Sequence, residues 1–212
     1  MLEVNIIEKK YFNKTVLNNI CFTITEPGIY GFIGLNGAGK TTLFECLSGI
    51  RKFTGNCSVN GNKMSLNNIG YIPTEPFLYE QLTSKEFITF YRELFNIQSE
   101  IPHLLFTVPD NKLIKNLSTG TRKKVYINAV FQKKFKLYLL DEPFNGLDVE
   151  SNYVLIEDLK RKAKDSIIIV SSHIIEILYK NCSRIFLLKN KGIIEYAPED
   201  FYKIEADFSS DI

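Results

Sequence analysis

The sequence is poor in the residues that build metal centres and disulfides. Its four cysteines, Cys21, Cys46, Cys57 and Cys182, stand far apart and form no C-x-x-C pair, and the chain has only two histidines. These features argue against a zinc site, a redox-active dithiol and a histidine-built metal centre. We therefore expect four reduced thiols, as in a cytoplasmic protein.

Long apolar runs and an excess of charge are also missing. The most apolar stretches, residues 28–35 and 167–170, are far shorter than the roughly 20 residues that a membrane-spanning helix needs. The N-terminal segment lacks the basic start and apolar centre of a secretory signal. The 26 basic and 24 acidic side chains leave a net charge of +2, which gives no broad field for nucleic acid. We expect no membrane span, no nucleic-acid partner and a cytoplasmic location.

What is present is the composition and patterning of one α/β domain. The 212 residues are 45% hydrophobic, enough to bury a core. Apolar and polar residues alternate over 2–7 and 16–25, which predicts two antiparallel strands. Helices are predicted between about residues 75 and 134 as an insertion. Elsewhere strands are predicted over 29–33, 136–140, 166–171, 184–188 and 192–196, and helices over 41–47, 149–163 and 173–179.

Two runs of basic residues fall inside predicted helices. They are Arg122-Lys123-Lys124 and the segment from Lys160 to Lys164. Charge runs of this kind usually cover the solvated face of a helix. Our interpretation of both runs is a water-facing surface.

A glycine-rich turn separates the strand predicted over 29–33 from the helix predicted over 41–47. Glycines let backbone N–H groups point inward, and the following helix offers its positive end to an anion. In such a turn Lys40 reaches the outer phosphates and Thr41 offers a hydroxyl to magnesium. The turn therefore predicts a nucleotide-phosphate site. It fits G-x-x-x-x-G-K-[ST] and consists of Gly34, Leu35, Asn36, Gly37, Ala38, Gly39, Lys40, Thr41 and Thr42.

Two carboxylates follow the apolar run at residues 137–140. Four consecutive apolar residues predict a strand buried on both faces, and α/β sheets hold ligands beyond the carboxyl ends of their strands. We predict that Asp141 holds magnesium beside Lys40 and Thr41. Glu142 would accept a proton from an attacking water or orient it. The alternative for this acid pair is a turn or a helix cap.

These motifs and several others occur in an order that resembles the nucleotide-binding subunit of ATP-binding cassette (ABC) transporters, over nearly the whole chain. The resemblance implies a P-loop NTPase core with a mixed, largely parallel sheet, formed by residues 1–74 and 135–212, and a helical subdomain at about 75–134. Besides the two Walker motifs, the similar segments are the signature Leu117-Ser118-Thr119-Gly120-Thr121, the D-loop Asn145-Gly146-Leu147-Asp148, the switch histidine in Ser172-His173, and Tyr11 as the adenine-stacking aromatic.

The resemblance also implies a head-to-tail dimer with two ATP molecules between the subunits. Ser118 and Gly120 of one chain would face the ATP held by the Walker loop of the other, where Ser118 suits a helix N-cap. Asp148 would act across the interface, or alternatively cap its own helix. His173 would contact the γ-phosphate or the attacking water, or alternatively cap the helix that follows it.

The implied ligands are ATP and Mg²⁺, and the implied partners are a second cassette and a permease. The second cassette would be identical or different, and the permease would be an integral membrane protein in a separate chain. The subunit would sit peripherally on the cytoplasmic face of the membrane. The aromatics Phe77, Tyr79 and Phe90, with Leu78, Phe87, Tyr91 and Leu94, are candidates for holding that partner, or alternatively for the core of the helical subdomain.

The sequence departs from the family pattern at two places. Thr74, followed by Glu75, stands where the family has a glutamine that contacts magnesium. Threonine is shorter, so Thr74 would reach the ion only through its hydroxyl or through water. In the signature, Thr119 and Thr121 replace glycine and glutamine, and a β-branched residue limits close backbone approach. We expect normal ATP binding with slower closure or turnover.

Two other functions fit parts of the pattern. One is an ABC ATPase that acts on ribosomes or DNA, which the single cassette, the absence of heptads and the small net charge disfavour. The other is a slow or non-hydrolysing cassette that senses ATP, which Thr74 and the altered signature favour. The main prediction is an ATPase subunit that drives a membrane permease.

Overall fold

The N-terminal alternation of polar and apolar residues folds into an antiparallel sheet. The computed structural model describes residues 1–98 and 104–209. In it β1 (Leu2–Tyr11) pairs with β2 (Lys14–Ile24) and with β4 (Thr54–Val59), and β5 (Asn62–Lys63) completes the order β2-β1-β4-β5. Both predicted N-terminal strands are present: β1 ends at Tyr11 rather than at residue 7, and β2 begins two residues earlier and ends one residue earlier than predicted. The sheet buries alternate residues such as Leu2, Val4 and Ile6.

The apolar runs of the rest of the chain form a second, six-stranded sheet. Its order is β10-β9-β3-β8-β7-β6, with β10 antiparallel to β9 and the other pairs parallel. Its central strands are buried on both faces, as continuous apolar runs require. The strands are β3 (Gly28–Ile33), β6 (Ile69–Ile72), β7 (Leu137–Leu140), β8 (Ile167–Ser171), β9 (Arg184–Lys189) and β10 (Gly192–Tyr196).

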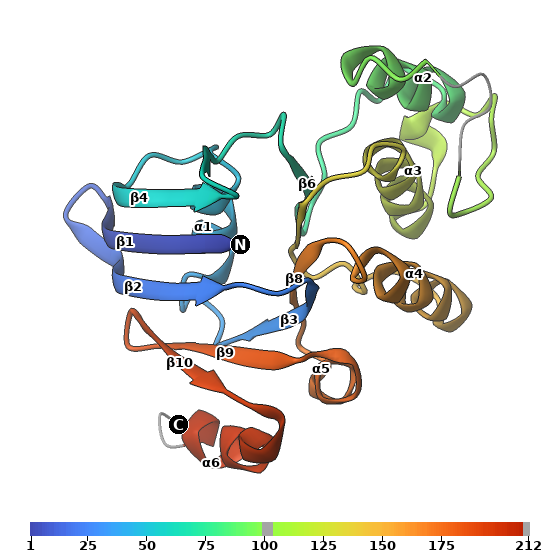
Figure 1. The fold of residues 1–212 in the computed structure, drawn as a ribbon. Coiled ribbons are helices and arrows are strands. Elements are labelled where there is room, and N and C mark those ends of the chain that lie inside the picture. Colours follow the sequence, from blue (N-terminus) through green and yellow to red (C-terminus); the bar gives the residue numbers. More distant parts are fainter. Residues whose placement is uncertain (99–103, 210–212) are drawn as a thin grey trace.

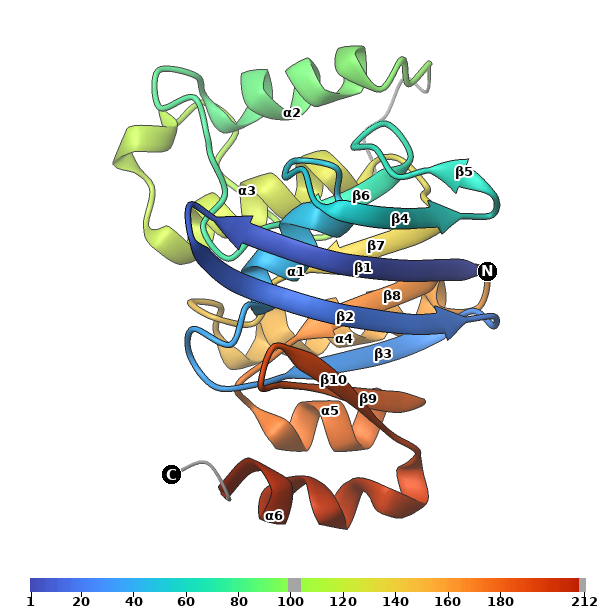
Figure 2. The same cartoon turned by 90° about the vertical axis from the view of Figure 1, so that its left-hand side faces the viewer.

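The two sheets and a set of helices form three layers. The antiparallel sheet lies against one face of the six-stranded sheet, with α1 (Lys40–Leu47) between them (Figures 1 and 2). On the other face lie α3 (Thr119–Phe131), α4 (Val149–Lys162) and α5 (Ile175–Asn181) (Figure 1). Each interface has its own hydrophobic core: Phe32, Phe44 and Phe186 lie in the first, and Phe87, Tyr138 and Leu155 in the second.

The insertion predicted between about residues 75 and 134 contains two helices that contact each other. α2 (Ser84–Leu94) begins with a capping box between Thr83 and Glu86. α3 begins after Ser118, and the short 3-10 helix η1 (Ile114–Asn116) precedes it. Asn128 of α3 bonds to the backbone of Leu105 and Phe106, which ties the segment before η1 to this helix. Figure 1 shows α2 and α3 together at one end of the molecule.

The α/β class with antiparallel N-terminal strands is confirmed, and the remaining differences concern one helix start and two short helices. α5 begins at Ile175, so the predicted helix start at His173 is wrong. The 3-10 helix η2 (Pro198–Lys203) and α6 (Ile204–Ser209) were not predicted and lie beyond β10. Cys21, Cys46, Cys57 and Cys182 are free thiols. None of the helices in the described ranges has the length and apolarity of a membrane span.

Candidate functional site

A cleft opens beyond the carboxyl ends of β3, β7 and β8. It has a volume of about 730 Å³ and brings together residues far apart in the sequence. Polar groups gathered beyond the ends of neighbouring parallel strands are the usual ligand site of an α/β sheet. Of the predicted site residues, it is lined by Tyr11, Asn36, Gly37, Ala38, Gly39, Lys40, Thr41, Thr42, Thr74, Asp141, Glu142 and His173.

The glycine-rich turn wraps around the start of α1. Gly39, immediately before α1, has a φ of 108°, which favours glycine. At Gly34 the limit is space, because a Cβ there would lie 2.7 Å from the backbone oxygen of Leu188. The Lys40 ammonium is buried and donates to the carbonyl oxygens of Gly34 (2.7 Å) and Leu35 (3.3 Å). The turn thus holds the Lys40 ammonium against its own backbone, directly before α1.

A chain of hydrogen bonds joins the turn to the end of β7. Thr41 Oγ1 donates to Asp141 Oδ2 at 2.7 Å, and Ser171 Oγ donates to Asp141 Oδ1 at 2.7 Å. Ser171 Oγ also accepts from the backbone N–H of Glu142 at 2.8 Å. Both oxygens of Asp141 are therefore fixed, one from α1 and one from β8. Ser171 was not predicted as a site residue, and its only signal in the sequence is its position at the end of a buried strand.

The second carboxylate, Glu142, is held by His173, which lies two residues beyond the end of β8. The backbone N–H of His173 donates to Glu142 Oε2 at 3.2 Å, and His173 Nε2 lies 3.1 Å from Glu142 Oε1. The side chain of His173 caps no helix, so that alternative is wrong. Glu142 has a φ of 50°, a left-handed conformation that is costly outside glycine.

Burial sets the electrostatics of this cluster. Desolvation raises the pKa of Glu142, while the nearby His173 and Lys40 act in the opposite direction. Desolvation likewise lowers the pKa of Lys40, and Glu142 and Asp141 act against that shift. A buried carboxylate that has a raised pKa, lines a cleft and is oriented by a histidine has the properties of a general base.

The oxygen donors fit one particular kind of metal. Thr41 and Asp141 offer a hydroxyl and a carboxylate in contact at the cleft. Mg²⁺ is usually held by one or two carboxylates together with substrate phosphates and water. Among the described residues no group of three or more His, Cys, Asp or Glu side chains is arranged as a metal cage. The pair therefore suits a magnesium ion that arrives with a nucleotide.

Tyr11, the last residue of β1, also lines the cleft. Its hydroxyl donates to Glu45 Oε2 at 3.4 Å, and the ammonium of Lys9 lies 4.5 Å from the centre of its ring. Five further lining residues were not predicted. They lie at the β1–β2 and β9–β10 turns, and they are Lys14, Thr15, Val16, Asn190 and Lys191. Positive charge at these two turns was their only signal.

The predicted signature residues and Asp148 of the D-loop do not line this cleft, whereas Asn145 of the D-loop does. Ser118 Oγ accepts from the backbone N–H of Thr121 at 3.2 Å, so Ser118 is the N-cap of α3 as expected. Asp148 accepts from the backbone N–H of Ser151 at 2.8 Å and pairs with Lys124 at 2.8 Å. The helix-cap alternative for Asp148 is thus confirmed within the single chain. Gly120 contacts the loop after β7 closely, since a Cβ there would lie 2.5 Å from Gly146 O.

One of the two basic runs is not a solvated face. Lys123 is only 4% exposed, and its ammonium donates to the carbonyl oxygens of Glu142 (2.5 Å) and Asn145 (3.1 Å). Burial lowers its pKa to about 8, against the attraction of Glu142 and Asp141. The interpretation of this residue as water-facing is therefore wrong. Sequence alone did not show which turn of α3 faces the loop after β7.

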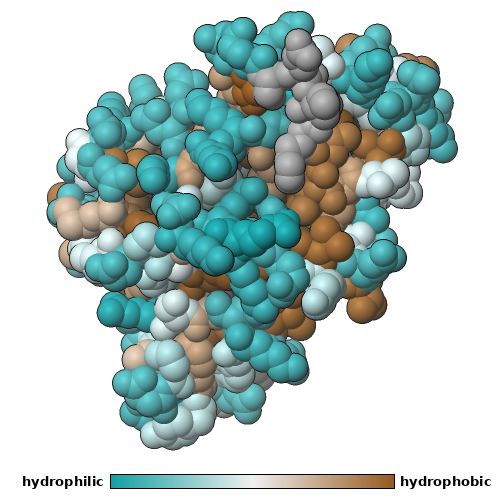
Figure 3. All heavy atoms as spheres, turned by 45° about the vertical axis from the view of Figure 1, so that its right-hand side comes forward, coloured by the Kyte–Doolittle hydropathy of each residue, from teal (hydrophilic) through white to brown (hydrophobic). Residues whose placement is uncertain are grey.

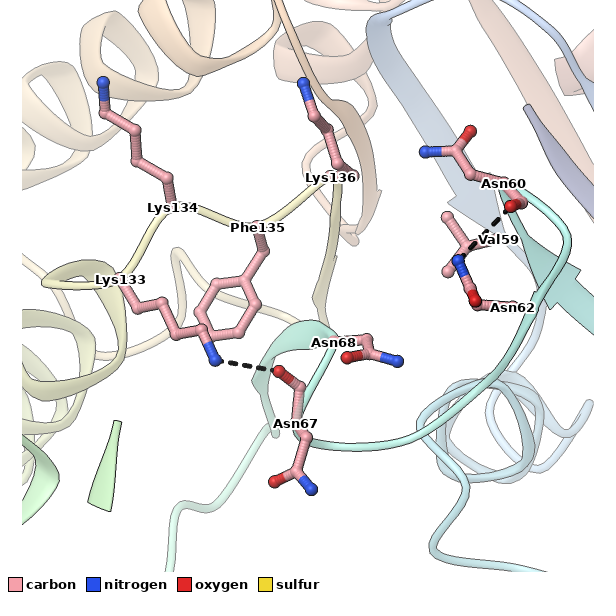
Figure 4. Close-up of a pocket in the computed structure, with 9 residues that line it drawn as sticks. All are labelled: Val59, Asn60, Asn62, Asn67, Asn68, Lys133, Lys134, Phe135 and Lys136. Carbon is pink, nitrogen blue, oxygen red and sulfur yellow. Dashed lines mark hydrogen bonds between the residues drawn. The ribbon is translucent and has the colours of Figure 1, made fainter. Parts of the chain in front are cut away.

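A second cleft, of about 370 Å³, lies between the β4–β5 hairpin and the segment that joins α3 to β7 (Figure 4). Lys133 Nζ donates to the carbonyl oxygen of Asn67 at 3.0 Å, while Lys134 and Lys136 extend away from Asn67. None of its lining residues is acidic, and none belongs to the predicted nucleotide site. The first cleft is therefore the candidate site.

Comparison with known proteins places most of the chain in the family that its motifs resemble. The family model described as ABC transporter matches residues 17–145. An ABC transporter ATP-binding protein of Methanocaldococcus jannaschii is 34% identical over 92% of this chain and 76% of its own length. The lantibiotic transport ATP-binding protein SrtF of Streptococcus pyogenes is 31% identical over 100% of this chain and 97% of its own.

Solved structures agree on the fold. The ATP-binding subunit of an ABC transporter superposes with a TM-score of 0.87 at 28% identity, over 98% of this chain and 94% of the other. A dimeric ATP-binding cassette in a post-hydrolysis state with ADP and Pi has a TM-score of 0.81 at 18% identity, over 93% and 99% of the two chains. The second match concerns the fold alone.

Proposed function

This chain belongs to the ABC transporter family as an ATP-binding subunit of the ATPase class, and from that premise we propose that it hydrolyses MgATP between two cassettes to drive a separate permease. The observation that carries the proposal is the hydrogen-bonded series Thr41, Asp141, Ser171 and Glu142, which ends at His173. This series connects a phosphate-binding turn to a buried carboxylate. Residues 1–74 and 135–212 would form the ATP-binding core and about 75–134 the helical subdomain.

ATP would lie along the cleft from the turn to Tyr11. The backbone N–H groups of residues 34–42 and the Lys40 ammonium would bind its phosphates. Tyr11 would stack on the adenine, since it lines the same cleft as the phosphate-binding turn. Thr41 and Asp141 would hold Mg²⁺, and Thr74, which also lines the cleft, would approach it through its hydroxyl or a water molecule. When bound, Mg²⁺ neutralises phosphate charge and orients the terminal phosphate.

Glu142 would act on the attacking water. Its backbone N–H is fixed by Ser171 and its carboxylate by His173, so the carboxylate is oriented before substrate binds. The raised pKa of Glu142 makes it a better proton acceptor than an ordinary glutamate. His173, whose side chain is half exposed beside it, would contact the terminal phosphate or the same water.

A second copy, or a related cassette, would complete the site. Ser118 and Gly120 lie at the start of α3 and outside the cleft, so within one chain they contribute nothing to its lining. Placed against a partner's cleft, the N-terminus of α3 would offer backbone N–H groups to the terminal phosphate. Asp148 would then act across the interface in addition to capping α4.

A surface at the helical end is suited to a permease. Phe77 is 76% exposed, and its ring contacts Tyr79, which in turn contacts Phe90. Phe87 is buried and belongs to the core instead. Figure 3 shows hydrophobic residues gathered in a band across the face that carries the helices. Disulfide crosslinking from position 77 or 79 to a co-expressed permease tests this contact, and no crosslink at any tested position would contradict it.

The hydrolytic role is tested by Glu142→Gln. This change keeps the size of the side chain and removes the base, so phosphate release should fall by about 10²–10⁴-fold. ATP affinity measured by calorimetry should stay unchanged, because Glu142 contacts no part of the phosphate-binding turn in the hydrogen bonds described above. Wild-type hydrolysis in this variant would remove Glu142 from the mechanism.

A slow or non-hydrolysing ATP sensor is the second candidate. It is favoured by Thr119, which stands in the first turn of α3 where the family has glycine. Steady-state phosphate release with and without the membrane partner separates the two. Release that stays at background in both conditions would favour the sensor.

A further inference from the structure

Within one chain, α3 contacts Glu142 through Lys123. In the proposed dimer, α3 would serve the ATP bound by the partner chain, and Glu142 would serve the ATP bound by its own chain. α3 begins with the predicted signature residues, and Lys123 lies one turn further along it. The Lys123 ammonium donates to Glu142 O at 2.5 Å and to Asn145 O at 3.1 Å. In the proposed dimer the start of α3 faces the partner's nucleotide, whereas Glu142 faces the chain's own.

Glu142 is hydrogen-bonded at its backbone N–H, its carbonyl oxygen and Oε2, while Oε1 is buried without a hydrogen-bond partner among the described residues, 3.1 Å from His173 Nε2. Ser171 accepts from its N–H, Lys123 donates to its carbonyl oxygen, and His173 contacts both carboxylate oxygens. The left-handed φ of 50° at Glu142 needs such support, because this conformation is unfavourable for a residue with a Cβ. The orientation of the carboxylate therefore depends on where the Lys123 ammonium lies.

Burying the charged Lys123 side chain at this position costs free energy. It is 4% exposed, and its two short contacts are to carbonyl oxygens. An ammonium buried in this way costs free energy that a methionine of similar shape would not. Losing both acceptors would leave a buried charge without hydrogen bonds, so the ammonium and the two carbonyls are expected to move together.

Two neighbouring contacts make the connection rigid. The backbone of Gly120 lies directly against Gly146 O, where no side chain would fit. Lys124 pairs with Asp148 at 2.8 Å. α3 thus touches the loop after β7 at three positions, Gly120, Lys123 and Lys124, and a displacement of the helix is passed on to that loop.

We propose that Lys123 is a positioning residue that couples the two ATP sites, by moving Glu142 when α3 engages the nucleotide bound to the partner chain. This inference rests on the proposed function, because it needs a dimer that hydrolyses ATP. Its consequence is that hydrolysis at one site depends on nucleotide at the other. Lys123 itself lies outside the lining of the nucleotide cleft, so it affects turnover and cooperativity rather than ATP affinity.

The test compares Lys123→Met, Lys123→Gln and the wild-type chain. Methionine keeps the length and removes the donors, whereas glutamine keeps a neutral donor but is too short to reach both carbonyls. We expect Lys123→Met to lower kcat about tenfold and to bring the Hill coefficient for ATP towards one. Lys123→Gln should lower kcat about threefold. Both variants should bind the magnesium complex of a non-hydrolysable ATP analogue with a Kd within about twofold of the wild-type value. An exposed lysine of the α3–β7 segment, changed in Lys134→Met, is the control and should alter none of these values.

The outcomes separate this inference from the proposed function. A wild-type chain that binds the analogue but hydrolyses no ATP contradicts both. A wild-type chain that hydrolyses ATP, with a Lys123→Met variant of equal kcat and Hill coefficient, contradicts the coupling alone. A loss expressed only as weaker analogue binding also contradicts it. Thermal melting checks that each variant is folded, and if Lys123→Met does not fold, an undiminished kcat and Hill coefficient in Lys123→Gln would overturn the coupling.

Discussion

Replacing Ser171 by alanine removes one hydroxyl that serves two acidic residues at once. Ser171 Oγ donates to Asp141 Oδ1 and accepts from the backbone N–H of Glu142, and it is fully buried. A hydrogen bond to a charged group contributes about 1.5–3 kcal/mol, and a buried N–H left without an acceptor costs about 1–3 kcal/mol. Because the same atom makes both bonds and a water molecule can replace part of them, we expect the free energy of unfolding to fall by about 2–4 kcal/mol.

The matched control is Ser166→Ala, just before the opposite end of the same strand. Ser166 Oγ donates to Phe135 O at 2.7 Å and is also buried. It makes one bond between neutral groups, so its loss should cost about 1 kcal/mol. Urea denaturation followed by circular dichroism measures both values. For a chain of this size, each kcal/mol corresponds to roughly 2–4 °C in Tm.

Phosphate release distinguishes a site residue from a purely structural one. Ser171→Ala should lower kcat by at least about tenfold, since Asp141 and Glu142 lose the group that orients both. Ser166→Ala should leave kcat unchanged. A Ser171→Ala chain as stable and active as wild type, or an equal loss of kcat in both variants, would refute the reasoning.

Two further predictions follow from the contacts of α3. Gly120→Ala places a Cβ 2.5 Å from Gly146 O and should lower the free energy of unfolding by about 1–3 kcal/mol. In the control Gly192→Ala, the nearest atom to the new Cβ is 3.6 Å away, and the free energy of unfolding should change by no more than about 0.5 kcal/mol. Equal urea midpoints for the two variants would contradict this prediction. Because burial lowers the pKa of Lys123 to about 8 from its ordinary 10.5, the unfolded chain holds more protons between these values, and the stability of wild type relative to Lys123→Met should rise from pH about 8 to about 10. A difference that stays constant in urea titrations across that range would show that Lys123 titrates normally.

The sequence predicted the parts of the site that short motifs define. The glycine-rich turn needs glycines and a lysine at fixed spacing, so residues 34–42 were found directly, and the acid pair followed from an apolar run that ends in two carboxylates. The structure brings Lys40, Asp141 and Glu142 to one cleft, as expected. Local pattern was sufficient here because each of the two motifs consists of residues that are adjacent in the sequence.

The residues that were missed act through tertiary contacts. Ser171 looks like any serine at the end of a strand until the register of β7 and β8 places it beside Asp141. Lys123 sits in a basic run, and the run does not show which of its residues points into the protein. His173 was placed inside a helix although it precedes α5 by two residues, because no strong capping residue marks that boundary.

The most direct test of the central claim is specific activity as a function of protein concentration. If ATP is hydrolysed only between two cassettes, phosphate release per chain should rise with the concentration of the chain and level off when dimers predominate. Glu142→Gln should remain near background throughout. Specific activity that is the same at all concentrations would contradict a site shared between two chains, and background release at every concentration would contradict hydrolysis itself.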